Sequence, residues 1–168
     1  MQDEEKPWKT DLAQRSAQRR TVVAGEIEGA IKKAPSFEDG LNQAVEILKK
    51  RFARFSAITA YVADGEGLAL HTAVERPAGP ERIGSTEGPL GQAAQAEKPT
   101  VAADVRGDEG WQKVGFTSGS VLVAPVRTDA GLWAILEIWS DFRDAFTPQD
   151  VKMLQTVTAA LARKTPAA

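Results

Sequence analysis

Glu137 is the residue of this sequence best placed to bind a ligand, because its carboxylate interrupts a strongly apolar stretch over residues 132–140. In a strand, Glu137 shares one face with Trp133, Ile135 and Trp139. A buried carboxylate needs a partner, which can be a protein base or a ligand cation. Indoles around a carboxylate can form a box for an aromatic or cationic group, or they can simply pack in a core. Both pairs of alternatives stay open.

Residues 104–119, here called the lid loop, form the second candidate feature, since they carry glycines and charges without a clear period. A long irregular stretch in a compact domain is commonly a lid or a binding loop. We expect Trp111 or Phe116 to close a pocket. Asp104 and Asp108 lack the ligand spacing of a calcium loop, so we expect solvent-facing charges and no metal.

The absence of cysteine excludes thiol nucleophiles, disulfides and thiolate metal sites. His71 is the only imidazole, and we assign it no role because it alternates with apolar strand residues. A Ser-His-Asp triad is therefore nearly excluded. The run Ser118-Gly119-Ser120 has no nucleophile-elbow pattern, so we predict no catalytic residues.

The chain has 168 residues, of which 42% are hydrophobic and 26% charged, and this predicts one domain with a single core. A net charge of −2 from interspersed acids and bases gives no broad basic face, so we expect no nucleic-acid partner. Arg15, Arg19 and Arg20 are expected on the solvated face of a helix. Without a long apolar run or a basic leader, a cytoplasmic location without membrane contact is expected.

Helical periodicity and capping residues predict four helices, of which the last begins at a Thr147–Pro148 cap and the third is short. Alternating apolar residues predict five strands, and Pro125 implies an edge or a bulge within one of them. The helices are expected at residues 9–33, 36–54, 89–98 and from 148, and the strands at residues 56–62, 68–74, 100–103, 121–127 and 132–140. This order indicates an α+β fold, with an antiparallel sheet, helices on one face and loops on the other.

Three stretches resemble the GAF family of small-molecule-binding sensor domains in their order and spacing, namely residues 87–91 with 101–105 following, residues 120–126, and residues 131–138 running on to 145–150. The resemblance runs from Leu41 to Leu161. It implies an antiparallel sheet of about six strands, a ligand pocket on one face and, on the other, a helical layer that often mediates dimers. It also implies a sensory role in signal transduction, as in bacterial regulators.

Within that family, the sequence is similar to the free methionine-R-sulfoxide reductases, but it has Leu90 where those enzymes place a cysteine between glycines. A sulfoxide is reduced there by thiolate attack, which no serine can replace. Of the acidic residues that would hold the substrate ammonium, Glu137 matches one position, while Val121 and Trp139 stand at two others. The cysteine of bilin-binding members and the residue set of cyclic-nucleotide-binding members are also missing.

We therefore expect a GAF-like domain at residues 36–165, preceded by an N-terminal helix at residues 1–35 that packs on the domain or dimerises. The expected function is binding of an unknown small organic ligand, without catalysis or cofactor, as a homodimer through the terminal helices. Alternatives are an interaction module with a self-filled pocket and a degenerate relative of the reductases. The predicted ligand-binding residues are Glu137, Trp139, Trp111, Phe116, Val121 and Asp104.

Overall fold

A computed structural model describes residues 7–75 and 80–166, and its elements follow the predicted order closely. Two elements were not predicted, namely the short strand β3 and the short helix α4 within the lid loop. The elements are α1 (Pro7–Lys33), α2 (Phe37–Arg51), β1 (Ala57–Ala63), β2 (Gly67–Val74), β3 (Arg82–Gly84), α3 (Gly88–Gln95), β4 (Thr100–Ala102), α4 (Glu109–Lys113), β5 (Ser120–Thr128), β6 (Gly131–Ser140) and α5 (Pro148–Arg163). Part of the predicted loop before β3, residues 76–79, lies outside the described residues.

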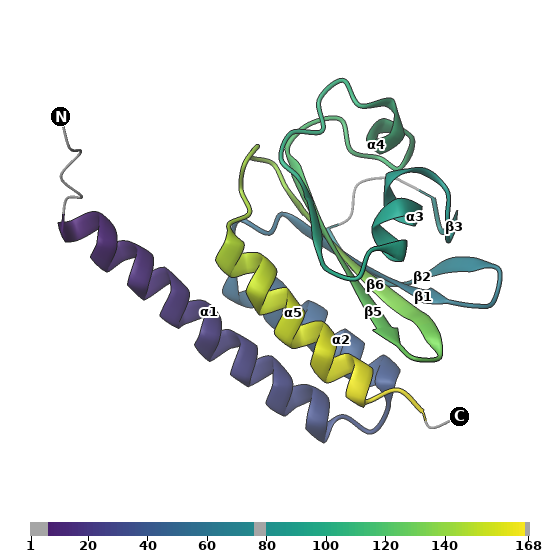
Figure 1. Ribbon diagram of the computed structural model, residues 1–168, viewed down its shortest axis with the longest axis horizontal. Helices are drawn as coiled ribbons and strands as arrows, with labels where there is room; N and C mark the ends of the chain where they lie inside the picture. The colour runs from purple at the N-terminus through teal and green to yellow at the C-terminus, as the bar shows by residue number, and fades with distance from the viewer. Residues whose placement is uncertain (1–6, 76–79, 167–168) are drawn as a thin grey trace.

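The strands form one antiparallel sheet in the order β3-β2-β1-β6-β5-β4, which confirms the predicted α+β class. Helices α1, α2 and α5 lie on one side of the sheet, and α3, α4 and the lid loop lie on the other (Figure 1). The sheet therefore separates two apolar cores. The larger core packs α1, α2 and α5 against residues such as Leu122, Leu136 and Ile138, and the smaller one lies under α3 and α4.

The helices begin where the sequence supplies capping groups. The Ser36 hydroxyl accepts a hydrogen bond from the backbone N–H of Asp39 at the start of α2. At the start of α5, the Thr147 hydroxyl accepts from the N–H of Asp150, and the Asp150 carboxylate accepts from the N–H of Thr147. Such reciprocal caps satisfy N–H groups that the helix itself leaves without partners.

Pro125 lies at an edge, as predicted, because β4 pairs with β5 only at residues 121–123. Beyond that point β5 has a free side, where the missing proline N–H costs no ladder bond. A register shift follows between Val126 and Arg127. Because of this shift, the predicted face of Trp133 is wrong. Trp133 does not share the face of Glu137, and it packs with Phe37 in the helix-side core, with ring centroids 6.0 Å apart.

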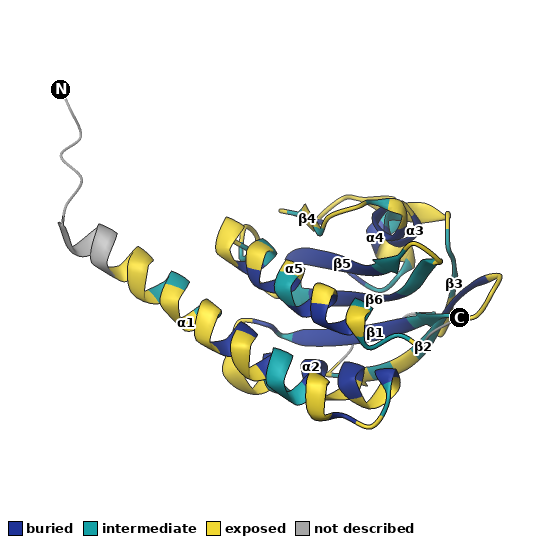
Figure 2. Ribbon diagram, turned by 60° about the horizontal axis from the view of Figure 1, so that its bottom comes forward, coloured by how far each residue is buried: buried dark blue, intermediate teal, exposed yellow. Residues whose placement is uncertain are grey.

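The helix α1 packs on α2 and α5, and its N-terminal end projects beyond the rest of the domain (Figure 1). Figure 2 shows that buried residues on α1 are confined to the half near the domain, where Val23, Ile27 and Ile31 face the core. The described part of the chain contains no helix that is long and apolar enough to cross a membrane.

Candidate functional site

Glu137 lies at the centre of the sheet, on the face covered by the lid loop. Its cross-strand partners are Thr59 on β1 and Val123 on β5. The side chains before and after it on the same face, Ile135 and Trp139, belong to the smaller core. Glu137 is only 2% exposed, so its carboxylate lies away from water among apolar groups. A carboxylate in such a place favours a positively charged or hydrogen-bond-donating partner.

Trp111, Phe116 and Trp139 form a continuous aromatic cluster on the same side of the sheet as Glu137. The ring centroids of Trp111 and Phe116 are 6.1 Å apart, and those of Phe116 and Trp139 are 5.8 Å apart. These distances lie in the range of favourable edge-to-face and tilted ring pairs. Trp111 and Phe116 are both buried in the smaller core, and the expectation that one of them closes a pocket stays a prediction.

The lid loop is held in a compact conformation by hydrogen bonds between its own residues. The N–H of Val105 donates to the carbonyl oxygen of Gly119 over 3.0 Å, which brings the two ends of the loop together. Asp108, expected as a solvent-facing charge, caps α4 by accepting from the N–H groups of Gly110 and Trp111. These bonds hold the backbone of the turn that carries Trp111, whose indole is buried in the smaller core. An aspartate just before an acidic first turn is a signal that the sequence did supply.

The other predicted site residues lie in different surroundings. Val121 is fully buried on the lid side of the sheet, where it pairs with Trp139. Asp104 lies at the surface outside the aromatic cluster, with its carboxylate 2.8 Å from the Arg106 guanidinium. Hydrogen bonds from that guanidinium hold the pKa of Asp104 below its ordinary value. The assignment of Asp104 as a ligand-binding residue stays a prediction, and the location of Asp104 at the surface does not favour it.

Leu90 on α3, at the position that the sequence resemblance assigns to a cysteine, is buried in the smaller core. Thr59 on β1 is a buried residue of the site that the sequence analysis does not single out. It is 1% exposed and stands directly across from Glu137, so its hydroxyl adds a second buried polar group to the site. Only the register between β1 and β6 reveals this pairing, and no local pattern encodes it.

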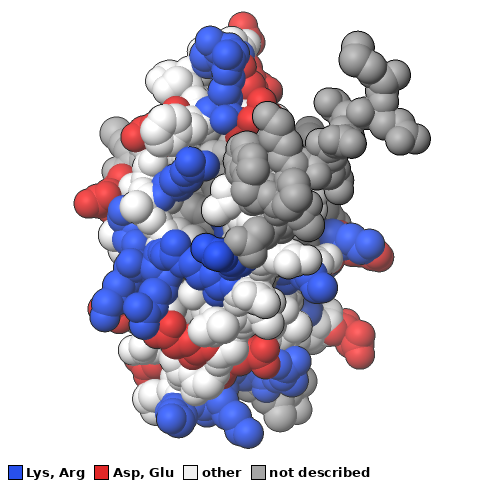
Figure 3. Space-filling view, turned by 90° about the vertical axis from the view of Figure 1, so that its left-hand side faces the viewer, with Lys and Arg blue, Asp and Glu red and all other residues white. Residues whose placement is uncertain are grey.

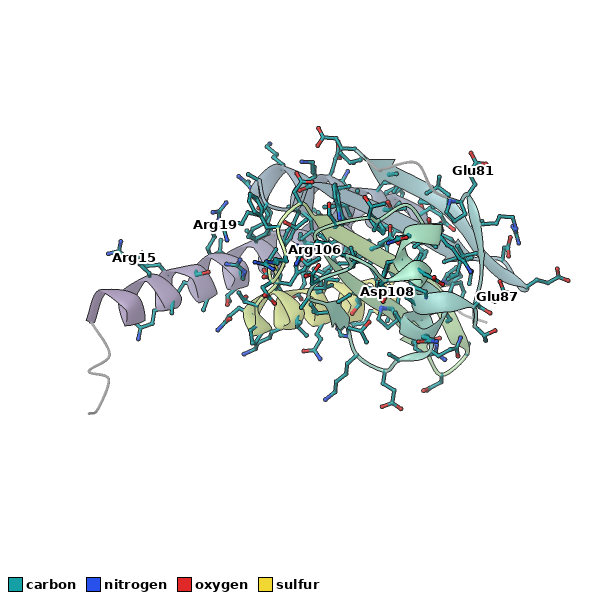
Figure 4. The ribbon with its side chains drawn as sticks, turned by 90° about the horizontal axis from the view of Figure 1, so that it is seen from above. Arg15, Arg19, Glu81, Glu87, Arg106 and Asp108 are labelled. Carbon is teal, nitrogen blue, oxygen red and sulfur yellow. The ribbon has the colours of Figure 1, made fainter. Side chains whose placement is uncertain are left out.

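Surface charge adds little to the site. On the end of the molecule from which α1 projects, basic and acidic side chains lie next to one another (Figure 3). Figure 4 places Arg106 and Asp108 on the lid loop, and Glu81 and Glu87 at the end opposite to Arg15 and Arg19. His71 is exposed on β2. Among the described residues, no group of three or more metal-ligating side chains comes together.

A family model described as GAF domain matches residues 34–163. The chain belongs to the GAF domain family. The matched region begins just after α1 and ends at the last residue of α5, so this GAF domain contains the whole sheet, the lid loop and the aromatic cluster. No curated protein matches the sequence.

Solved structures share the fold of this GAF domain at low sequence identity. The free methionine-R-sulfoxide reductase from Neisseria meningitidis, in complex with its substrate, superposes with a TM-score of 0.79 at 22% identity, covering 89% of each chain. A putative GAF sensor protein from Burkholderia vietnamiensis gives 0.76 at 18% identity, covering 89% of this chain and 94% of that one. The GAF domain of a phosphoenolpyruvate-protein phosphotransferase from Coxiella burnetii gives 0.74 at 19% identity, covering 88% and 93%.

Proposed function

We propose that this GAF domain binds a small organic molecule with a cationic or amine group, without converting it, between the sheet and the lid loop. The observation that carries the proposal is the burial of Glu137 on the lid side of the sheet, on the same strand face as Trp139, whose indole packs against Phe116. A carboxylate attracts the cationic group, and aromatic faces add cation–π attraction. The family's sensory role supports binding as the function.

Thermal unfolding with simple cations tests this proposal. A ligand present at one hundred times its Kd stabilises the folded state by about 2.7 kcal/mol. We expect choline or a primary amine of similar size to raise the Tm of the wild-type chain. Glu137→Gln keeps the shape of the side chain and removes its charge, so it should abolish the shift. Glu81→Gln makes the same change at the surface and should leave the shift intact (Figure 4).

The absence of catalysis is part of the proposal, and the missing cysteine supports it for the reaction of the reductases. Leu90 replaces the cysteine of the reductases, and the chain contains no cysteine at any position. Reduction of a sulfoxide by thiolate attack and disulfide formation therefore has no nucleophile in this chain. We expect no consumption of free methionine-R-sulfoxide when a thiol is added. Measurable turnover would support a degenerate reductase instead.

The second candidate is an interaction module whose binding face is filled by its own side chains. The supporting observation is that Leu90, Val105, Trp111 and Phe116 are each at most 7% exposed and pack against the sheet. This candidate predicts that no small molecule changes the Tm, and that Trp111→Ala lowers stability by about 3–5 kcal/mol, as for other core aromatics. A ligand-dependent Tm that requires Glu137 would reject it.

A homodimer through α1 and α5 belongs to the same proposal. A groove of about 640 Å³ between the two helices is lined by small residues such as Ala17, Thr21 and Gly25, and a second hollow of about 670 Å³ continues it along α5. The 27 residues of α1 span about 40 Å, so its first turns extend past α5. A helical segment of that kind is marginal in water without a partner. The projecting part of α1 in a second copy is the proposed occupant.

Gly25 allows a sharp test of the dimer, because a side chain added there has no neighbour within 4 Å in the monomer. Gly25→Gln should therefore leave the monomer folded and fill the groove. We expect sedimentation to show dimers for the wild-type chain and monomers for this variant. Lys33→Gln, on the same helix but outside the groove, should remain dimeric. A monomeric wild-type chain, or a dimeric Gly25→Gln variant, would reject the interface.

A further inference from the structure

Two consecutive arginines of α1 bind the ends of two different helices. Arg19 donates from its guanidinium to the carbonyl oxygen of Arg51, at the C-terminal end of α2. Arg20 donates from Nε to Oδ1 of Asp150 over 2.5 Å, at the N-terminal end of α5. Both guanidinium groups also lie over the ring of Phe52, at 5.2 and 5.3 Å from its centroid. The expectation of a solvated arginine face is therefore wrong for Arg20, whose side chain is only 17% exposed.

The partner of Arg20 is a fully buried carboxylate with two roles. The Asp150 side chain is 0% exposed. While Oδ1 accepts from Arg20, Oδ2 accepts from the backbone N–H and the hydroxyl of Thr147, over 2.8 and 3.1 Å. One carboxylate thus joins α1 to the cap of α5. Removal of one partner from a buried pair leaves a buried charge, so the cap and the ion pair depend on each other.

The segment before this cap is fastened to the first residue of β5. Buried Ser120 donates from Oγ to the carbonyl oxygen of Phe142 over 2.6 Å and accepts from the N–H of Ala145 over 3.3 Å. Ser120 comes two residues after Ser118, whose carbonyl oxygen accepts from the Trp139 indole over 2.8 Å. A continuous set of hydrogen bonds and short backbone segments therefore runs from the aromatic cluster to Asp150.

The connection from the aromatic cluster ends at α1, which lies outside the region matched by the family model. The region matched by the GAF family model begins at residue 34, so Arg20 lies outside it and Asp150 lies inside. Arg20 comes three residues before Val23, the first buried residue in the part of α1 whose side chains the structure describes, so it lies near the point where α1 leaves the domain. The ion pair is a link between the domain that holds the site and the helix that extends away from it.

We propose that the Arg20–Asp150 pair is a latch through which the packing of the aromatic cluster controls how firmly the projecting part of α1 is held. That a ligand changes this packing rests on the proposed function. The existence of the latch does not, because a substitution that changes the packing should have the same effect on α1. Coupling of this kind requires a measured interaction between the two sites, which a double-mutant cycle provides.

Hydrogen exchange in a double-mutant cycle tests the latch without any ligand. Trp139→Phe keeps a ring in the cluster and removes the N–H that binds Ser118. We expect it to raise the exchange of amides 16–24 about three-fold or more relative to those of α2, which serve as the internal reference. Arg20→Gln alone should raise the same rates, and Trp139→Phe should then add nothing further. Lys33→Gln is the control that should change neither.

Two further variants keep the test decisive. Asp150→Asn retains a cap oxygen and loses the charge, so it should reproduce the effect of Arg20→Gln. Phe116→Leu replaces Trp139→Phe as the packing change if the latter chain does not fold. The latch is rejected if packing changes leave α1 exchange unaltered, or alter it by the same factor with and without Arg20. Either result leaves the choline-dependent Tm, and so the proposed function, untouched.

Discussion

The indole nitrogen of Trp139 lies 2.8 Å from the carbonyl oxygen of Ser118, and this hydrogen bond joins the end of β6 to the end of the lid loop. Phe116, two residues before Ser118, packs against the same indole with ring centroids 5.8 Å apart. The Trp139 side chain therefore joins the strand that carries Glu137 to the loop that covers it, through one hydrogen bond and one ring contact.

Trp139→Phe should lower the free energy of unfolding by about 0.5–1.5 kcal/mol, the usual net value of one hydrogen bond. It should also raise amide exchange in residues 105–119. Trp133→Phe is the matched control, because the Trp133 indole donates to the Thr128 hydroxyl over 3.0 Å on a bulged part of β6. The control should have a similar effect on stability and none on the lid loop. Equal amide exchange of residues 105–119 in the two variants would contradict the role of the Trp139–Ser118 hydrogen bond in holding the lid loop.

Thr147→Ala should destabilise the protein by about 1 kcal/mol, because it removes the hydroxyl that accepts from the N–H of Asp150 at the start of α5. Thr147→Ser retains that oxygen and should lie close to wild type. Urea unfolding followed by circular dichroism measures both. If the alanine variant were as stable as the serine variant, the cap would contribute nothing.

Gly119→Ala should be strongly destabilising, since φ at Gly119 is +88° and an added Cβ would overlap the carbonyl oxygen of Ser140. Backbone strain of this kind alone costs about 1–3 kcal/mol. Gly25→Ala, measured on the monomer, is the matched control, because there it lies in a helix with open space around the added carbon. It should stabilise the protein by about 0.5–1 kcal/mol. Similar Tm values for the two variants would refute the stated packing at Gly119.

The exposed carboxyls of Glu26, Asp64 and Asp104 should titrate below their ordinary pKa values, because hydrogen bonds from Arg51, Arg82 and Arg106 respectively stabilise their charged forms. A lowered pKa in the folded state stabilises the protein above the unfolded pKa, and this contribution is lost as pH falls through the folded value. The free energy of unfolding should therefore fall below about pH 4.

Arg106→Gln provides the check on one of these pairs. Carboxyl carbon shifts followed by NMR should show the pKa of Asp104 rising toward its ordinary value of 3.8, with Glu26 unaffected. An unchanged pKa for Asp104 would mean that the ion pair does not persist in solution.

The order of elements and the role of Thr147 could be predicted from the sequence, because periodicity and capping are local properties. The face of the sheet on which Trp133 lies could not be predicted. A bulge opposite Val126 and Arg127 interrupts the alternation of side chains, and only the strand pairing shows it. Arg20 was misplaced for a similar reason. Its partner, Asp150, is 130 positions away, and only the packing of α1 on α5 brings the two together.

In the candidate site too, residues that stand out locally could be predicted, and residues whose role depends on strand pairing could not. Glu137, Trp111 and Phe116 could be selected because a charge in an apolar strand and aromatics in an irregular loop stand out locally. Thr59 could not be selected, because its importance depends on lying across from Glu137. Asp104 was selected on local grounds, and the structure places it with Arg106 at the surface.

Native mass spectrometry of the purified protein tests the central claim most directly, because it detects a retained molecule whatever the identity of that molecule. The account predicts that the wild-type chain and Glu81→Gln carry the same additional small organic mass. Glu137→Gln should carry much less of it. A wild-type spectrum that shows only the bare protein, or an additional mass retained equally by Glu137→Gln, would contradict a binding site built around Glu137.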